Sequence, residues 1–157
     1  MVTTGDHAPD FTAPLANGDV DSFTLSERLD EAPLVFAFFP GAFTSTCSHE
    51  LETFEERVDD LADAGATLYG VSVDLPFALN AFRSDLGLSF GLLSDSNREV
   101  VRAWDVTMDF VSSGVDDVAK RAVFVVNGDG AVAYDWVTED AGIEPDYDAV
   151  VAAVDKI

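Results

Sequence analysis

The chain has 157 residues, of which 48% are hydrophobic and 24% are charged, a length and composition typical of about one globular domain. Its 30 acidic residues outnumber 8 basic ones and give a formal net charge of −22 at pH 7. A negative field of this size repels phosphate backbones, which argues against a nucleic-acid partner. Because the acidic residues are scattered and not gathered in a tail, we expect an acidic surface whose self-repulsion is screened by salt, as in a protein of a halophilic microbe.

The sequence shows no sign of a membrane segment or of a bound cofactor. The longest apolar run, Leu34–Phe39, is far shorter than the roughly 20 residues that span a bilayer. The opening MVTTGDHAPD has neither a basic region nor an apolar signal core, so we expect a cytoplasmic protein. A single cysteine excludes an internal disulfide and a multi-cysteine metal site, and two histidines make other metal sites poor candidates. No glycine-rich phosphate loop is present. We therefore expect no metal and no cofactor.

Hydrophobic spacing and turn residues predict alternating strands and helices along the chain. Residues 11–15 and 19–23 are predicted to form a β-hairpin around Ala16-Asn17-Gly18, and Leu34–Phe39 a buried strand. A helix is predicted through Leu51, Phe54, Val58 and Leu61, ending at Gly65. A strand at Thr67–Val73 and a helix at Pro76–Leu86 follow. The second part predicts a strand at Ser89–Leu93, a helix at Arg98–Trp104, strands at Arg121–Val126 and Ala131–Trp136 joined by the turn 127–130, and a helix at Asp146–Val154.

These elements predict a single α/β domain over residues 1–157. Successive strand–helix–strand units imply a parallel portion of the sheet with helices packed on it, and the late hairpin adds an antiparallel pair. The expected fold is thioredoxin-like, with a central mixed sheet flanked by helices and an N-terminal β-hairpin extension.

The one cysteine, Cys47, lies just after the apolar strand, in the segment FFPGAFTSTCSHEL. Pro40 ends the strand, and Ser45 or Thr46 is the expected N-cap of the next helix, so Cys47 falls in the first helical turn. Free backbone N–H groups and the positive end of the helix dipole favour a thiolate there. A free cysteine is commonly a small buried apolar residue, but the hydroxyl-bearing neighbours on both sides of Cys47 are not typical of an apolar core.

Other thiol chemistries fit the sequence less well. A phosphate-binding Cys-x5-Arg loop would need arginine at position 53, which is Thr53. A cysteine protease needs a histidine base, but His49 is two residues from Cys47 and points to a different face of the helix. His7 could approach Cys47 only through the fold. We expect both histidines on the surface.

The spacing Pro40-x3-Thr44-x2-Cys47 resembles the active-site signature of the peroxiredoxins, the thiol peroxidases of the alkyl hydroperoxide reductase/thiol-specific antioxidant family. The opening GDHAPDFTAPLANGD is similar to the family's N-terminal segment, and Arg121 heads the strand RAVFVV where the family carries its active-site arginine. The spelling FPGAFTSTCSHEL and the single cysteine resemble the one-cysteine alkyl hydroperoxide reductase E type most. The bacterioferritin-comigratory-protein group is also similar, but it often has a second cysteine where this chain has Glu52.

The resemblance implies a thiol-dependent peroxidase in which the Cys47 thiolate attacks the peroxide and becomes a sulfenic acid. Thr44 would hydrogen-bond the peroxide, Arg121 would supply positive charge and Pro40 would shield the sulfur from water. With no second cysteine, an external thiol must reduce the sulfenic acid; the candidates are a thioredoxin-like protein, a glutaredoxin-like protein and a low-molecular-weight thiol. Glu50 matches a glutamate that helps to hold the arginine in related enzymes, and one more acid on an acidic helix is an equally good interpretation.

Two functions stay open at this point. The favoured one is a one-cysteine thiol peroxidase, and the alternative is a non-enzymatic thioredoxin-fold redox-sensing or binding domain that uses Cys47 as a switch. Hydrogen peroxide, organic hydroperoxides and peroxynitrite are all candidate substrates. The resemblance also implies a homodimer or a higher homo-oligomer. Phe43 and Trp104 are expected in the core, with a place near the pocket or at a dimer contact as the alternative.

Overall fold

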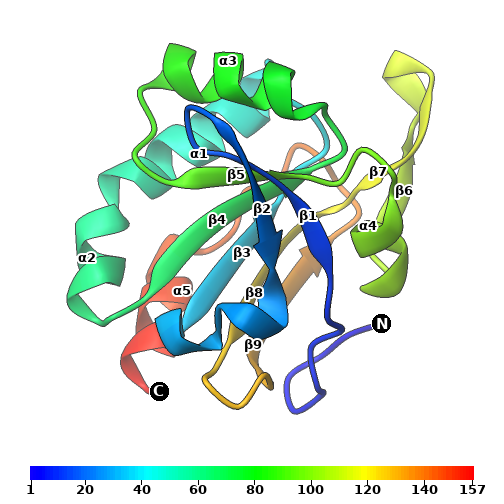
Figure 1. The fold of residues 1–157 in the computed structure, drawn as a ribbon. Coiled ribbons are helices and arrows are strands. Elements are labelled where there is room, and N and C mark those ends of the chain that lie inside the picture. The colour runs from blue at the N-terminus through cyan, green and yellow to red at the C-terminus, as the bar shows by residue number, and fades with distance from the viewer.

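Nine strands form two sheets of unequal size in the computed structural model, which describes residues 1–157 (Figure 1). The strands are β1 Thr12–Ala16, β2 Val20–Thr24, β3 Leu34–Phe38, β4 Thr67–Ser72, β5 Gly91–Ser94, β6 Thr107–Phe110, β7 Val115–Ala119, β8 Arg121–Val126 and β9 Val132–Thr138. The helices are α1 Ser45–Glu56, α2 Val58–Asp63, α3 Pro76–Leu86, α4 Glu99–Ala103 and α5 Tyr147–Asp155, with short 3-10 turns η1 Leu25–Glu27, η2 Leu29–Glu31 and η3 Val111–Ser113. None of the helices has the length and apolarity that a membrane crossing requires.

The large sheet has seven strands in the order β2-β1-β5-β4-β3-β8-β9, and the small sheet pairs β6 with β7. β3, β4 and β5 are parallel to one another, whereas the pairs β1–β2, β3–β8 and β8–β9 are antiparallel. The predicted mixed sheet, its flanking helices and the N-terminal hairpin are therefore all present.

β3 lies inside the large sheet and is buried along its whole length. Phe36 and Phe38 belong to one hydrophobic cluster, and Val35 and Ala37 belong to another. This division is expected because successive side chains of a strand point to opposite faces of the sheet. Burial on both faces explains why the strand is a continuous apolar run in the sequence.

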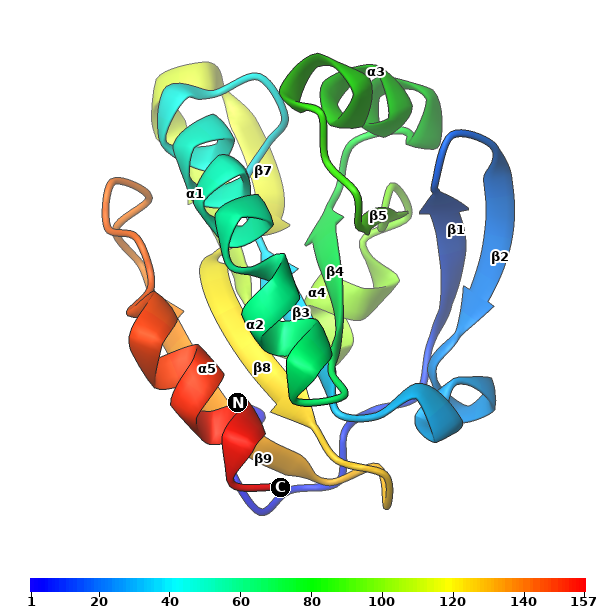
Figure 2. The same ribbon diagram turned by 90° about the vertical axis from the view of Figure 1, so that its left-hand side faces the viewer.

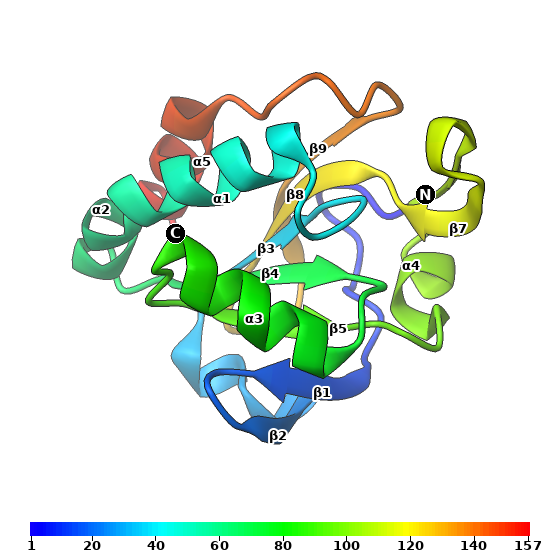
Figure 3. The same cartoon turned by 90° about the horizontal axis from the view of Figure 1, so that it is seen from above.

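Each face of the large sheet is covered by different elements. Residues of α1, α2, α3 and α5 pack in the cluster that contains Val35, and Figure 2 shows α1, α2 and α5 on one side of the molecule. α4, β2 and the N-terminal segment contribute to the cluster that contains Phe36. Seen from above, α1 and α5 lie at one side of the molecule, and α4 and the β6–β7 hairpin lie at the other (Figure 3).

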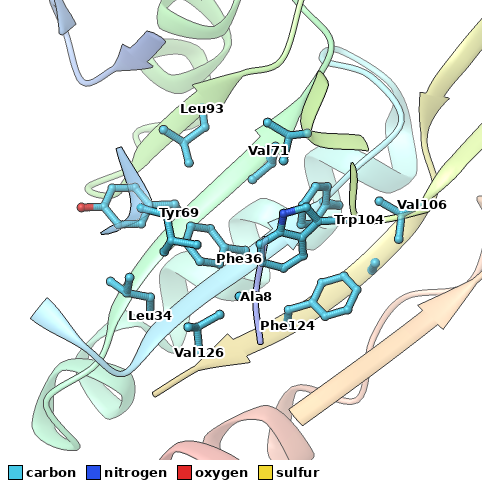
Figure 4. Packing of buried hydrophobic residues seen from close by; sticks show 14 of the residues in the cluster. Ala8, Leu34, Phe36, Tyr69, Val71, Leu93, Trp104, Val106, Phe124 and Val126 are labelled. Atoms are coloured by element: carbon cyan, nitrogen blue, oxygen red, sulfur yellow. The ribbon is translucent and has the colours of Figure 1, made fainter. Parts of the chain in front are cut away.

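Trp104 is the centre of the aromatic packing on the α4 side of the sheet (Figure 4). Its ring centroid lies 5.8 Å from that of Phe36, 5.6 Å from Phe38 and 5.0 Å from Phe124. The Trp104 indole N–H donates to the Pro9 carbonyl at 3.2 Å, so its polar atom is also satisfied. The core assignment of Trp104 is confirmed.

Two parts of the chain differ from the sequence-based expectation. The single helix predicted to end at Gly65 is divided into α1 and α2, because the Arg57 N–H donates to the Phe54 carbonyl at 3.0 Å in a tight i to i−3 bond. The buried stripe nevertheless continues from Leu51 to Leu61 across the break. The sequence patterns also predict no element for residues 107–119, where the structure has the β6–β7 hairpin.

Candidate functional site

The first turn of α1 carries the cysteine. α1 begins at Ser45, and its N-cap is Thr44, with extended backbone at φ −84° and ψ 150°. The prediction of Ser45 or Thr46 as the N-cap is therefore wrong. The sequence could not distinguish them from Thr44, because consecutive hydroxyl residues are all suitable N-caps. The Thr44 hydroxyl does not cap the helix but donates to the Gly41 carbonyl at 3.0 Å. Cys47 is the third residue of α1, within the first turn as expected.

The loop before α1 is fixed by Asp74, just beyond the end of β4. One carboxylate oxygen of Asp74 accepts the Ala42 backbone N–H at 2.8 Å and the Ser72 hydroxyl at 2.7 Å. The next loop residue, Phe43, has a positive φ of 65° and a 58% exposed side chain, which lies against the Phe82 ring. The core assignment of Phe43 is therefore wrong, since this backbone conformation leaves the ring at the surface.

The antiparallel register of β3 and β8 places Arg121 beside the cysteine. Phe38, the last residue of β3, pairs with Ala122, so Arg121 lies at the same end of the sheet as the loop that leads into α1. The Arg121 Nη2 atom lies 3.3 Å from the Cys47 sulfur. Both side chains are buried, each with about 1% of its surface exposed. The contact is therefore shielded from bulk water, and electrostatic attraction is stronger in such a buried site than in water.

Glu50 is one helical turn after Cys47 and faces the same guanidinium. Its Oε1 atom accepts a hydrogen bond from Arg121 Nη1 at 2.7 Å, in an ion pair with both side chains buried. The other oxygen, Oε2, is buried without a hydrogen-bond partner. The Ala141 carbonyl accepts from Arg121 Nε at 3.3 Å and from Nη2 at 2.7 Å. These contacts hold the guanidinium plane in one orientation toward the sulfur.

Burial and charge shift the titration of this pair. Burial raises the pKa of Glu50 to about 7, although the Arg121 charge and hydrogen bond act in the opposite direction. Burial alone would lower the pKa of Arg121, but the charges of Glu50 and Cys47 outweigh it and the pKa is raised. Arg121 is therefore a permanent cation, whereas Glu50 changes its charge near neutral pH.

A cavity of about 210 Å³ opens the site to small molecules. Thr44, Thr46, Arg121, Ala141 and Phe110 are among its lining residues. The cysteine does not line the cavity itself, but Arg121, which contacts the cysteine sulfur, does. Pro40 is buried and lines a neighbouring cavity instead.

Both histidines are exposed, as predicted. His49 Nδ1 lies 2.7 Å from Glu144 Oε1, and this hydrogen bond raises the pKa of His49. Its partner is a carboxylate and not the sulfur, so the structure gives no histidine base for Cys47. No group of three or more His, Cys, Asp or Glu side chains is arranged to hold a metal ion.

The structure brings several of the predicted site residues together and adds supporting residues that the sequence does not indicate. Arg121 contacts both Cys47 and Glu50, and Thr44 lines the same cavity as Arg121. Asp74, Phe110 and Ala141 are not anticipated. Asp74 has a recognisable signal, because it follows a predicted parallel strand and open α/β sheets gather functional groups at such strand ends. Ala141 acts through its backbone carbonyl, which leaves no signal in the sequence.

The fold and the site define a thioredoxin-like protein with a buried cysteine–arginine pair at the start of a helix. Residues 4–135 match the AhpC/TSA family. The chain belongs to this family, the peroxiredoxins, and the predicted family and thioredoxin-like fold are thereby confirmed.

Individual relatives agree with the family match. A Mycobacterium tuberculosis protein named as a peroxiredoxin is 37% identical over 133 residues, which cover 83% of this chain and 82% of the relative. The thiol peroxidase of Mycobacterium bovis is 31% identical over 154 residues, which cover 98% of this chain and 89% of the relative. The crystal structure of peroxidoxin BcpB from Mycobacterium tuberculosis superposes with a TM-score of 0.87 at 27% identity, covering 100% of this chain and 99% of the other.

Proposed function

We propose that the protein is a one-cysteine thiol peroxidase in which the Cys47 thiolate reduces hydrogen peroxide or an organic hydroperoxide. The 3.3 Å contact between Arg121 Nη2 and the Cys47 sulfur is the observation that carries the proposal. A permanent cation held at that distance in a buried site stabilises a negative sulfur. The first turn of α1 adds the positive end of the helix dipole.

In the first step, the thiolate attacks the terminal oxygen of the peroxide. An S–O bond forms and the O–O bond breaks, so the sulfur is oxidised by two electrons to sulfenic acid. The other oxygen leaves as hydroxide or alkoxide and takes up a proton to become water or an alcohol. Arg121 stabilises this developing negative charge, an effect worth roughly 3 kcal/mol for one well-placed donor.

Thr44 and Pro40 complete the proposed site. Because the Thr44 hydroxyl donates its proton to the Gly41 carbonyl, its free lone pairs can accept the O–H of the peroxide. Accepting this hydrogen bond would orient the peroxide with its terminal oxygen toward the sulfur. Pro40 is buried at the edge of the site, where it would keep bulk water from the thiolate.

The second step needs an external thiol, since the sequence has one cysteine. The thiolate of the reductant attacks the sulfenic sulfur and forms a mixed disulfide, and hydroxide leaves with a proton as water. A second thiol then attacks the mixed disulfide and regenerates Cys47. A thioredoxin-like protein, a glutaredoxin-like protein and a low-molecular-weight thiol are the candidate reductants.

Steady-state turnover with dithiothreitol tests the proposal. The protein should consume many equivalents of peroxide, Cys47→Ser should consume none, and Arg121→Lys should react about 100-fold more slowly because lysine cannot supply the same donor fork. His49→Ala is the matched control, and it should keep full activity because His49 is exposed and bonded to Glu144. Consumption that stops after one equivalent would instead identify a redox sensor.

We also infer that two copies associate beside the active-site loop. Phe43, Leu75 and Phe77 are 58%, 59% and 73% exposed, an unusual amount of apolar surface in one region. The 2.8 Å bond between the Ala42 N–H and Asp74 holds the two segments that carry these residues together. Sedimentation velocity should give a dimer that Phe43→Ser and Phe77→Ser weaken. A monomer at high protein concentration would contradict the inference.

A further inference from the structure

Two acidic groups share one cation at the start of α1. Arg121 donates from Nη2 to the Cys47 sulfur at 3.3 Å and from Nη1 to Glu50 Oε1 at 2.7 Å. All three side chains are buried, each with at most 1% of its surface exposed. Water is therefore excluded from the three groups, and a second negative charge among them would have no counter-ion. Cys47 and Glu50 thus compete for the single positive charge of Arg121.

The carboxyl group of Glu50 has only one of its two oxygens satisfied. Oε1 accepts from Arg121, but Oε2 is buried and has no hydrogen-bond partner. A negative charge on this group would forgo the hydrogen bonds that water gives a carboxylate, whereas a protonated carboxyl carries no charge to solvate. The geometry therefore favours a protonated Glu50 whenever Arg121 has another anion beside it.

The other groups that face Glu50 do not supply a second cation. Glu144, between β9 and α5, and Tyr147, on α5, are the remaining titratable groups near it. The Tyr147 hydroxyl donates to Glu144 Oε1 at 2.6 Å. Burial raises the pKa of Glu50 to about 7, and the charge of Glu144 acts in the same direction, against Arg121. A thiolate on Cys47 would raise the pKa of Glu50 further, since like charges oppose each other's ionisation.

We infer that Cys47 and Glu50 hold one negative charge between them, and that this charge passes from the sulfur to the carboxylate when Cys47 is oxidised. Before the reaction, Cys47 is a thiolate and Glu50 is protonated. The sulfur gives two electrons to the peroxide, the S–O bond forms and the O–O bond breaks, and the sulfenic acid that results is neutral. Glu50 then releases its proton, which balances the proton that the leaving oxygen takes up.

The summed charge of Cys47, Glu50 and Arg121 therefore stays at zero through the oxidation. When a thiol later restores the thiolate, Glu50 takes a proton back. The inference rests on the proposed peroxidase activity, and it assigns Glu50 a part in the proton balance of the reaction in addition to its contact with Arg121.

Infrared difference spectroscopy tests the inference, because it separates a protonated carboxyl group from a carboxylate. One equivalent of hydrogen peroxide is added to the reduced protein without any thiol, at about pH 7.5, where the charge on the sulfur decides the state of Glu50. The original protein should lose one protonated-carboxyl band and gain a carboxylate band. Glu50→Gln should show neither change. Glu52→Gln is the matched control, because Glu52 is exposed on the same helix, and it should show both.

Net proton uptake is a second readout, which a purely structural Glu50 would not alter. In weak buffer with a pH indicator, the original protein should take up almost no protons during the oxidation. Glu50→Gln should take up about one proton per peroxide, because the leaving oxygen must then draw its proton from the solvent. Equal proton uptake by the two proteins would contradict the inference.

A protonated-carboxyl band that persists after oxidation, or that is lost equally from Glu50→Gln, would overturn the inference while peroxide is still consumed. Failure of the original protein to consume peroxide would instead overturn the proposed function, and the inference with it. If Glu50→Gln does not fold, the infrared change of the original protein decides alone: loss of the band supports the inference, and its persistence overturns it.

Discussion

At the residue scale, Arg121 divides its donors among three acceptors. It contacts the Cys47 sulfur, the Glu50 carboxylate and the Ala141 carbonyl. Removing such a cation would leave a buried carboxylate without a partner, which typically costs about 3–5 kcal/mol. Arg121→Ala would therefore lose stability as well as activity. Arg121→Lys, which keeps the charge, is for this reason the more informative test of chemistry.

Glu50 gives the site a pH-dependent stability. Burial raises the pKa of Glu50 from 4.5 to about 7 in the folded protein. Between these two pH values, Glu50 keeps its proton in the folded protein and releases it in the unfolded protein. The contribution of this proton to the free energy of unfolding is full below about pH 4.5 and is lost as the pH rises through about 7. We expect Glu50→Gln to remove this loss, so that the variant gains stability over the original protein between about pH 5 and about pH 8.

Urea unfolding at each pH measures the effect. Glu52→Gln is the matched control. Glu52 lies on the exposed side of the same helix, so its substitution removes an equal charge without disturbing Arg121. A stability difference between Glu50→Gln and the original protein that does not change with pH would contradict the expectation.

The sequence predicts the residues of the candidate site better than the residues that hold them in place. Cys47, Thr44 and Arg121 stand out because each is a reactive or charged group at a strand or helix end. Glu50 is ambiguous in the sequence, since it is one of many acids, and only its burial against Arg121 distinguishes it. The Ala141 carbonyl is a backbone group in a loop, so no side-chain pattern could reveal its contact with Arg121.

At the element scale, the site depends on three strand ends and one helix end meeting in one place. β3 leads into the loop, β4 ends before Asp74, and β8 begins at Arg121 next to them. The helix α1 then starts at Ser45, five residues after Pro40. A change in the loop should therefore affect the cysteine even when it touches no reacting atom.

Asp74 tests this dependence. Asp74→Ala removes the acceptor of the Ala42 N–H and the Ser72 hydroxyl, and hydrogen bonds to a charged group are worth about 1.5–3 kcal/mol. We expect a lower melting temperature and at least a tenfold slower reaction with peroxide, because the loop that positions Thr44 is released. Asp85→Ala on the exposed side of α3 should change neither quantity. An Asp74 variant with the original reaction rate would show that the loop holds its shape without this anchor.

Elements with strong apolar patterns are predictable from this sequence, and the weakly patterned hairpin is not. The buried strands β3 and β8 have continuous apolar runs that are visible without a structure. β7 contains Asp116 and Asp117, which disfavour strands, and it pairs only with the four-residue strand β6. The hairpin is therefore stabilised by tertiary packing of residues such as Val118, and local propensity does not indicate it.

At the scale of the whole molecule, the net charge of −22 is the dominant feature. The few ion pairs lie mostly at the surface, where each contributes little, so repulsion among the remaining acids is not neutralised. We propose that the protein is adapted to high salt. Salt at molar concentration shortens the screening length to about 3 Å and should remove most of this repulsion.

Thermal unfolding in KCl tests the proposed salt adaptation. Between low salt and molar KCl, the melting temperature should rise by at least about 5 °C. Sucrose at matched osmolality is the control, because it stabilises by exclusion from the surface and does not screen charge. A melting temperature that is the same at both KCl concentrations would show that charge repulsion does not limit stability.

The most direct test of the account is the intact mass of the protein after one equivalent of peroxide. We expect the gain of one oxygen atom on Cys47, its loss when a reducing thiol is added, and its return with the next equivalent of peroxide. The candidate thiols can be compared by the rate at which each restores the original mass. A protein that gains no oxygen, or gains it at a residue other than Cys47, would contradict the account.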